Sequence, residues 1–135
     1  GYELFKSYGC ISCHNGINIG GNLFQKMGIL KEHNYKNDKY LGRYNVTKNE
    51  EDKYYFKVPT LRNVSKTAPY FHNGNVWSLK DAVKEMGSTQ LGISISDKES
   101  EQIVTFLKSL TGKKPTIIYP VLPTLSDKTP KPQFD

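Results

Sequence analysis

Cys10-Ile11-Ser12-Cys13-His14 is the stretch from which the rest of this sequence is best interpreted. The pattern C-x-x-C-H is the attachment signature of c-type haem. Two thiols three positions apart can each form a thioether with one porphyrin, and the adjoining imidazole of His14 can bind the iron from the proximal side. The motif therefore predicts one covalent haem c held by Cys10, Cys13 and His14.

Other uses of two nearby cysteines fit this chain poorly. A structural zinc site needs four ligands, usually several of them cysteines, and the chain has only two cysteines. A thioredoxin-type dithiol belongs in a βαβ unit, and no such pattern is present here. A disulfide across two residues would close a loop too small to stabilise the fold much.

The composition agrees with a domain whose core includes a cofactor. The 135 residues suit one domain, and hydrophobic residues make up only 36% of them. So few apolar side chains make a core hard to build unaided, and a porphyrin would supply the missing apolar surface. The lysines behind the net charge of +6 are spread from Lys6 to Lys131, which indicates a solvated surface or a basic docking face for an acidic partner.

Two kinds of binding are not expected. Nucleic-acid binding would require a basic stripe or a known motif, and no apolar run approaches the ~18 residues that span a bilayer. No signal peptide is visible. Because haem is attached to such motifs outside the cytoplasm, we expect a periplasmic bacterial location and the removal of a signal or a longer precursor. Gly1 is then either a mature N-terminus or a cut edge.

Helical periodicity predicts three helices. The first spans residues 2–8 and delivers the haem motif. The second begins at Ser78, with Asp81 three residues on, and is expected to end with Met86 because Gly87 follows. The third begins at the Ser96–Glu99 capping box and ends at Gly112; its apolar face consists of Ile103, Phe106, Leu107 and Leu110.

The remaining segments are expected to be long loops. Residues 15–28 are glycine-rich, residues 29–57 are polar with room for a short hairpin, and the prolines at 59 and 69 favour extended chain. Five of the seven prolines follow Lys113. We therefore predict a mainly α, cytochrome c-like domain over residues 1–112 and an extended C-terminal arm over residues 113–135.

A second axial ligand to the iron must come from Met27, Met86, His33 or His72. Met27 is only thirteen residues beyond His14, and His33 is most simply a surface residue. His72 suits either a buried, hydrogen-bonded histidine or a docking face. Met86 lies on the apolar stripe of its helix and is the favoured ligand, although a core methionine is the alternative. Histidine–methionine ligation would give a higher potential than two histidines.

The sequence resembles the C-terminal, high-potential haem domain of bacterial di-haem cytochrome c peroxidases. The blocks Val58-Pro-Thr-Leu-Arg-Asn63 and Thr67-Ala-Pro-Tyr-Phe-His72 are the most specific parts of the match. The match also includes residues 1–5, the haem motif, residues 20–28, 42–43, 78–86, 90–92 and 106–112, and the prolines of the tail.

This resemblance implies roles for further residues. His14 and Met86 fall on the axial pair of the electron-accepting haem. Thr67 and Pro69 fall where backbone carbonyls hold a calcium ion shared with a second haem domain, and carbonyl oxygen suits that ion. Arg62 falls where a haem propionate partner is expected, with ordinary surface ion pairing as the alternative. A methionine at position 86 favours the peroxidase branch over relatives that oxidise a partner protein.

The resemblance also implies partners. In this family peroxide is reduced at the haem of an N-terminal domain, and this chain has only one haem motif. We expect the chain to be the electron-input half, which lacks the peroxide-reducing site and receives electrons from a small cytochrome c or cupredoxin. It is then a domain fragment, a cleaved subunit or an independent protein. Two alternatives are a free-standing monohaem electron carrier and a haem whose Met86 dissociates to admit peroxide.

Overall fold

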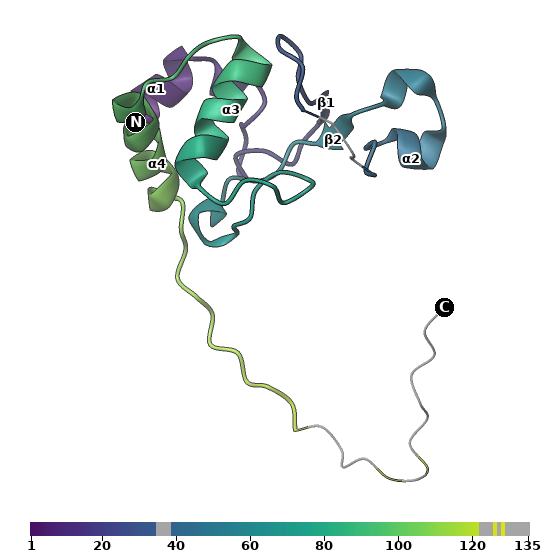
Figure 1. Cartoon of the computed structure of the whole chain (residues 1–135). Coiled ribbons are helices and arrows are strands. Elements are labelled where there is room, and N and C mark those ends of the chain that lie inside the picture. Colours follow the sequence, from purple (N-terminus) through teal and green to yellow (C-terminus); the bar gives the residue numbers. More distant parts are fainter. Residues whose placement is uncertain (35–38, 122–125, 127, 129–135) are drawn as a thin grey trace.

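Helices and a small sheet occupy opposite ends of this computed structural model, which describes residues 1–34, 39–121, 126 and 128. Helices α1 (Tyr2–Ser7), α3 (Leu79–Leu91) and α4 (Asp97–Ser109) gather at one end. Strands β1 (Phe24–Lys26) and β2 (Tyr55–Lys57) and helix α2 (Tyr44–Thr47) lie at the other (Figure 1). Three 3-10 turns, η1 (Cys10–Ser12), η2 (Glu50–Asp52) and η3 (Val64–Lys66), complete the elements.

The three long helices form the apolar core. Phe5 of α1 packs with Ile103 and Leu107 of α4 and with Ile95 from the α3–α4 connection, and all four are buried. The periodicity of α4 places its apolar side chains on one face, as expected from the sequence. This core is small, and several neighbouring apolar side chains, Ile19 and Leu61 among them, are only partly buried.

Helix α3 is longer than the sequence suggested. Ser78 caps it as predicted, since its hydroxyl accepts a hydrogen bond from the backbone N–H of Asp81 (3.3 Å). Gly87 does not end the helix, and Met86 is not its last residue. The helix continues to Leu91 and ends at Gly92, whose positive φ of 66° forms the left-handed cap. Gly87 lies where α3 meets Ile95, because a Cβ there would stand 2.6 Å from Ile95 Cδ1.

The capping box of α4 is present as predicted. Ser96 accepts from the backbone N–H of Glu99 at 3.3 Å, and the Glu99 carboxylate accepts from the Ser96 backbone N–H at 2.9 Å. The other Glu99 oxygen accepts a hydrogen bond from the Tyr8 hydroxyl at 2.6 Å. Helix α4 therefore holds the segment that leads into the haem motif. Its end differs slightly from expectation, because Leu110 caps it before Gly112.

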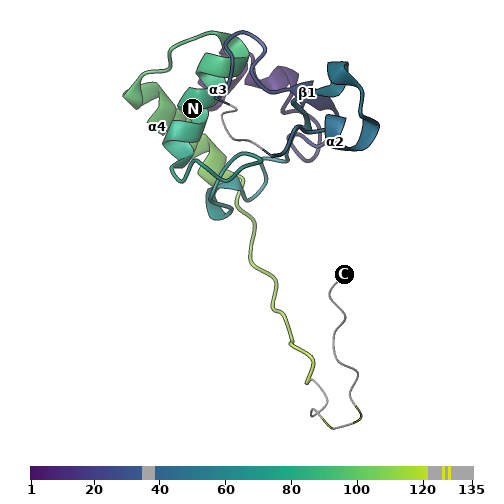
Figure 2. The same ribbon diagram turned by 45° about the vertical axis from the view of Figure 1, so that its right-hand side comes forward.

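The expected loops contain more structure than the sequence indicated. Strand β1 lies inside the glycine-rich stretch and pairs antiparallel with β2, with Phe24 opposite Lys57. A long connection that contains α2 joins these strands, so the pair is not a local hairpin. Figure 2 shows the small lobe they form beside α2, at a distance from α4.

The end of the chain leaves the helical core after α4. Residues 112–121 have no helix or strand and are exposed, and Figure 1 shows them running away from the body. The rest of the predicted arm lies almost wholly outside the described residues. Among the described residues, no helix combines the length and the apolar character needed to cross a membrane.

Candidate haem site

The C-x-x-C-H motif lies on a single tight turn. Gly9 enters it with a positive φ of 88°, and η1 then carries Cys10 around to Cys13. The backbone N–H of Cys13 and that of His14 both donate to the carbonyl of Cys10, at 3.3 and 3.0 Å. Because of these bonds, the two thiols and the imidazole belong to one ordered unit.

Both cysteines are free thiols and both are half-buried. Cys10 packs against the apolar core, and burial raises the pKa of its thiol. The described residues contain no cluster of three or more His, Cys, Asp or Glu side chains that could hold a metal ion. Within that part of the chain, Cys10 and Cys13 thus do not belong to a group of the size that a four-ligand zinc site needs.

The imidazole of His14 is packed against backbone on one side. Burial lowers the pKa of His14, and the carbonyls of Ile19 and Pro59 oppose this effect by favouring the protonated form. Its Nδ1 is buried, with the backbone of Ile19 and Pro59 as its polar surroundings. Both Pro59 O and His14 Nδ1 lie close to the point where a Cβ on Gly20 would stand, the latter at 3.2 Å. The lowered pKa of His14 favours the neutral imidazole, which is the form that binds a metal.

Met86 lies within α3, on the stripe that also carries Leu79, Ala82 and Val83. Its side chain is only half-buried. Met27, by contrast, is 7% exposed, and its sulfur accepts a weak hydrogen bond from the Gln90 amide at 3.8 Å. Burial thus separates the two methionines: Met27 is a core residue, whereas Met86 retains accessible surface.

Gln90 was not singled out in the sequence, although it holds a loop onto α3. Its amide nitrogen donates to Lys26 O at 3.0 Å, and its amide oxygen accepts from the Ile29 N–H at 3.2 Å. The sequence signals were its place in the matched segment 90–92 and its position four residues after Met86 on the same helical stripe. This clamp fixes β1 and the following turn beside the last turn of α3.

His33 is not the surface residue that the sequence suggested. It is 8% exposed, and its Nδ1 lies 3.0 Å from a carboxylate oxygen of Glu85. Its ring contacts Phe71 and His72 edge-on, and His72 in turn stacks on Phe56 with the ring centroids 4.0 Å apart. The polar sequence around His33 concealed this burial, because the partners are distant in the chain.

The remaining predicted residues lie on the loops that follow β2. Arg62 is exposed, and its Nε donates to the carbonyl of Ile17 at 2.7 Å, which places it beside the loop that follows His14. Thr67 and Pro69 are exposed and form a separate region after η3, where the Ala68–Pro69 peptide is cis. Binding of a propionate by Arg62 and of calcium by Thr67 and Pro69 stay predictions.

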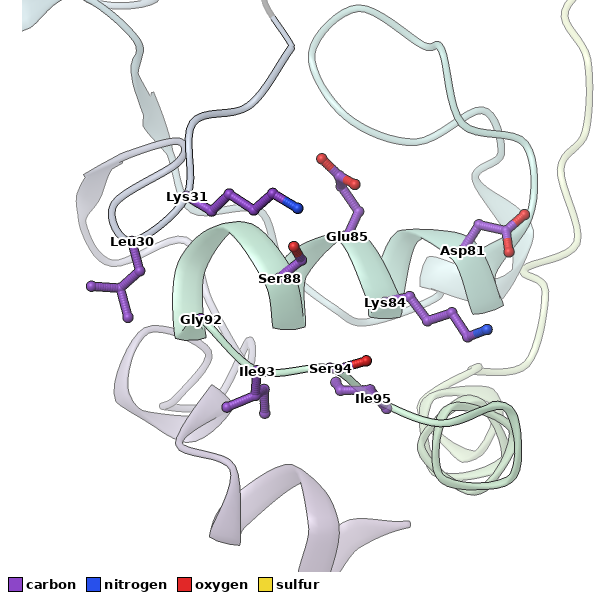
Figure 3. A pocket seen from close by; sticks show the side chains of 10 residues that line it. All are labelled: Leu30, Lys31, Asp81, Lys84, Glu85, Ser88, Gly92, Ile93, Ser94 and Ile95. Carbon is purple, nitrogen blue, oxygen red and sulfur yellow. The ribbon is translucent and has the colours of Figure 1, made fainter.

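A depression on the outer side of α3 is not the haem site. The charged side chains of Asp81, Lys84 and Glu85 on α3 border it, and the loop at Leu30 and Lys31 lies across from them, as Figure 3 shows. None of the four residues predicted to hold haem, Cys10, Cys13, His14 and Met86, lines it.

The sequence model of the family described as Cytochrome c matches residues 1–111. The chain belongs to the cytochrome c family. This cytochrome c domain carries the expected attachment motif in one ordered turn, and family membership implies covalently bound haem c. The half-buried thiols, the packed His14 and the partly exposed apolar side chains of Ile19 and Leu61 fit such a group.

Similar proteins refine this assignment. The chain is 47% identical over 136 residues to the cytochrome c551 peroxidase of Pseudomonas aeruginosa. This match covers 98% of the chain and 39% of that protein. It is 48% identical over 133 residues to the cytochrome c551 peroxidase of Nitrosomonas europaea, and this match covers 98% of the chain and 40% of that protein. The chain thus spans about two-fifths of the length of these bacterial relatives, and its homology to cytochrome c peroxidases, expected from the sequence, is confirmed.

One solved structure supports the fold. A crystal structure of a MauG-like protein associated with microbial copper homeostasis matches with a TM-score of 0.66 and 20% sequence identity, and the match covers 83% of this chain and 46% of the other. At this identity the likeness concerns the fold alone. It agrees with the arrangement of helices and the small sheet described above.

Proposed function

We propose that this cytochrome c domain is the electron-accepting half of a bacterial cytochrome c peroxidase, located in the periplasm. It would take single electrons from a small redox protein and pass them to a peroxide-reducing haem on another domain or chain. When bound, the haem supplies a one-electron Fe(III)/Fe(II) couple. The observation that carries the proposal is the ordered Cys10–His14 turn in a chain 47% identical to a cytochrome c peroxidase.

In this proposal Cys10 and Cys13 anchor the haem through thioethers, and His14 is the proximal ligand. The tight turn of η1 sets the spacing of the two sulfurs, and the backbone around Gly20 and Pro59 limits rotation of the imidazole. A fixed ring costs little reorganisation when the charge on the iron changes. That rigidity suits a site that transfers electrons.

Met86 is the proposed second axial ligand. Its thioether is soft and neutral and therefore favours the reduced iron, which raises the potential relative to histidine ligation. If His14 and Met86 both hold the iron, peroxide would have no free coordination position in this domain. Peroxide reduction would then occur elsewhere, in a part of the longer polypeptide or on an associated chain.

Thr67 and Pro69 are proposed to offer backbone carbonyls to a calcium ion completed by that partner. Both lie on an exposed loop and are therefore accessible to a second domain. Arg62 is proposed to neutralise a haem propionate, for which its guanidinium suits a carboxylate.

The test combines spectroscopy with turnover. The haem-loaded chain is expected to contain one covalent haem, to be low-spin in the ferric state and to reduce peroxide only when a second haem protein of the peroxidase is added. The control is the Cys10→Ala, Cys13→Ala double variant, which should lose covalent haem. High-spin ferric haem that reacts directly with peroxide would contradict the proposal. A low-spin chain that never associates with a second haem protein would instead indicate a free-standing electron carrier.

A further inference from the structure

Apolar and cationic side chains lie together on the surface beside the predicted haem site. Ile17 is 82% exposed and Phe24 is 51% exposed. Phe24 is directly opposite Lys57 in the β1–β2 pair, so their side chains point to the same side of the sheet. We call Ile17, Phe24, Lys57 and Arg62 the docking face.

A hollow lies between the two cations of this face. Lys57, Pro59 and Arg62 line it, together with Asn18, Thr60 and Asn63. Among the described residues, no carboxylate lines the hollow. A hollow bordered by one lysine and one arginine favours a negatively charged group on a binding partner.

The loop that displays Ile17 is held in place. Arg62 Nε donates to Ile17 O at 2.7 Å, and the Thr60 hydroxyl donates to the carbonyl of Asn18. Asn22 donates to Asn15 O at 3.2 Å at the base of the same loop. Arg62 is thus a positioning residue here, because its side chain holds the backbone of an exposed isoleucine.

The docking face is close to the site that would hold the haem. Pro59 lines the hollow and also lies beside His14, since its carbonyl oxygen and His14 Nδ1 both approach Gly20. A protein bound in the hollow would therefore be separated from the proximal imidazole by little more than the backbone at Pro59 and Gly20. This is a short route for an electron.

We propose that the docking face binds an acidic redox protein, a small electron donor that places a carboxylate near Lys57 and apolar surface on Ile17 and Phe24. The inference rests on the proposed electron-transfer function and adds the charge and the location of its partner. A small surface that combines a few exposed apolar side chains with cations suits a transient complex, whereas a permanent domain interface is larger and more apolar.

The experiment measures binding rather than turnover. The haem-loaded chain is titrated at low salt by calorimetry with plastocyanin, an acidic cupredoxin, and with a basic mitochondrial-type cytochrome c. The variants are Lys57→Glu and Ile17→Asn. Each variant has a matched control. Lys98→Glu reverses the charge of an exposed lysine on α4, and Val46→Asn replaces an aliphatic side chain that is 87% exposed on α2. The midpoint potential of each variant is recorded in parallel.

We expect plastocyanin to bind and the basic cytochrome to bind at least tenfold more weakly. Lys57→Glu should weaken plastocyanin binding about tenfold and, because it reverses a charge near the haem site, should also lower the midpoint potential. Ile17→Asn should weaken binding about threefold to tenfold with its potential unchanged, and binding by the controls should stay within twofold of the unmodified chain. If Lys98→Glu weakens plastocyanin binding as much as Lys57→Glu does, the effect is one of net charge and the inference is overturned. So would tighter binding of the basic protein, or no binding by either.

Two other occupants have distinct results. If a second copy of the chain covers the face, sedimentation will show a dimer that Ile17→Asn dissociates. If an anionic membrane covers the face, vesicles containing phosphatidylserine will bind the chain and plastocyanin will not. Lys57→Glu will then abolish the vesicle binding. Either result overturns the inference. A chain that carries covalent haem and cycles reversibly would in every case leave the proposed function intact, whereas a chain without redox cycling would refute that function itself.

Discussion

No side chain fits between Gly20 and His14. A Cβ on residue 20 would stand 3.2 Å from His14 Nδ1 and would overlap the carbonyl oxygen of Pro59. Gly20 also has a φ of 124°, a conformation that side-chain-bearing residues rarely adopt. The imidazole of His14 therefore packs against backbone at Gly20 and Pro59, with the ring of Phe5 at a centroid distance of 6.4 Å.

The first prediction follows from this contact. Gly20→Ala should lower the free energy of unfolding by about 1–3 kcal/mol and reduce the fraction of chain that carries haem, because Pro59 and His14 must move apart. The control is Gly9→Ala, since Gly9 also has a positive φ but a Cβ there would meet nothing within 4 Å. Urea denaturation and the pyridine haemochrome assay measure the two effects. Equal effects of both changes would show that the contact with His14 is unimportant.

The second prediction separates the two methionines. Met86→Ala should lower the midpoint potential by a substantial part of the ~0.8 V range that axial ligands span. Met27→Ala should leave the potential nearly unchanged and lower the free energy of unfolding by about 2–5 kcal/mol, because it empties a buried site. Spectroelectrochemistry and urea denaturation distinguish these outcomes. A potential that responds to Met27 and ignores Met86 would reverse the assignment.

The third prediction concerns acid stability. Hydrogen bonds from Ser96 and then from Tyr8 lower the pKa of Glu99 to about 2, from an ordinary value of 4.5. Because the folded-state pKa is the lower one, this stabilisation is complete above pH 4.5 and is lost as the pH falls toward 2. Glu99→Gln should therefore lower the melting temperature at pH 7 and flatten its decline below pH 4.5, as circular dichroism can record.

Tyr8→Phe is the companion variant for that experiment. It removes the 2.6 Å bond between Tyr8 and Glu99 but leaves the bonds from Ser96. The decline at low pH should consequently be reduced in part. A Tyr8→Phe variant with the full effect of Glu99→Gln would mean that the capping box contributes nothing to the titration.

The fourth prediction tests why α3 passes through Gly87. A Cβ at this position would approach Ile95 Cδ1 to 2.6 Å and Ile95 Cγ1 to 2.8 Å. Overpacking of this kind costs about 1–3 kcal/mol, which exceeds the gain of up to about 1 kcal/mol from replacing glycine by alanine in a helix. Gly87→Ala should thus be destabilising. Adding Ile95→Val, which removes Cδ1 but keeps Cγ1, should relieve part of the clash, so the double variant should be more stable than the sum of the two single effects predicts. A double-mutant cycle by urea denaturation measures this coupling.

What the sequence predicted well was local. The capping residues Ser78, Ser96 and Glu99 were recognisable because each satisfies backbone donors within three residues of itself. The Cys10–His14 unit was recognisable because its five residues are consecutive and their spacing is itself the signal. Roles that depend on one short segment can be assigned without knowledge of the fold.

What the sequence concealed depends on distant partners. Gly87 was read as a stop signal, but the residue that explains it is Ile95, which packs on it across the helix connection. His33 was assigned to the surface, whereas Glu85 and the ring of Phe71 bury it. Strand β1 was missed because its pairing partner lies about thirty residues away, beyond any local pattern.

The anchoring of the tail has a consequence for whatever the tail binds. Asn63 accepts from the Gly112 N–H at 2.9 Å, and the Ser65 and Thr111 hydroxyls are 2.8 Å apart, so the tail leaves from a fixed point beside η3. Residues 113–121 can reach at most about 30 Å from there. A molecule bound to residues 113–121 would therefore stay within that distance of the Thr67–Pro69 loop, at an effective concentration high enough for weak contacts on the loop to retain it.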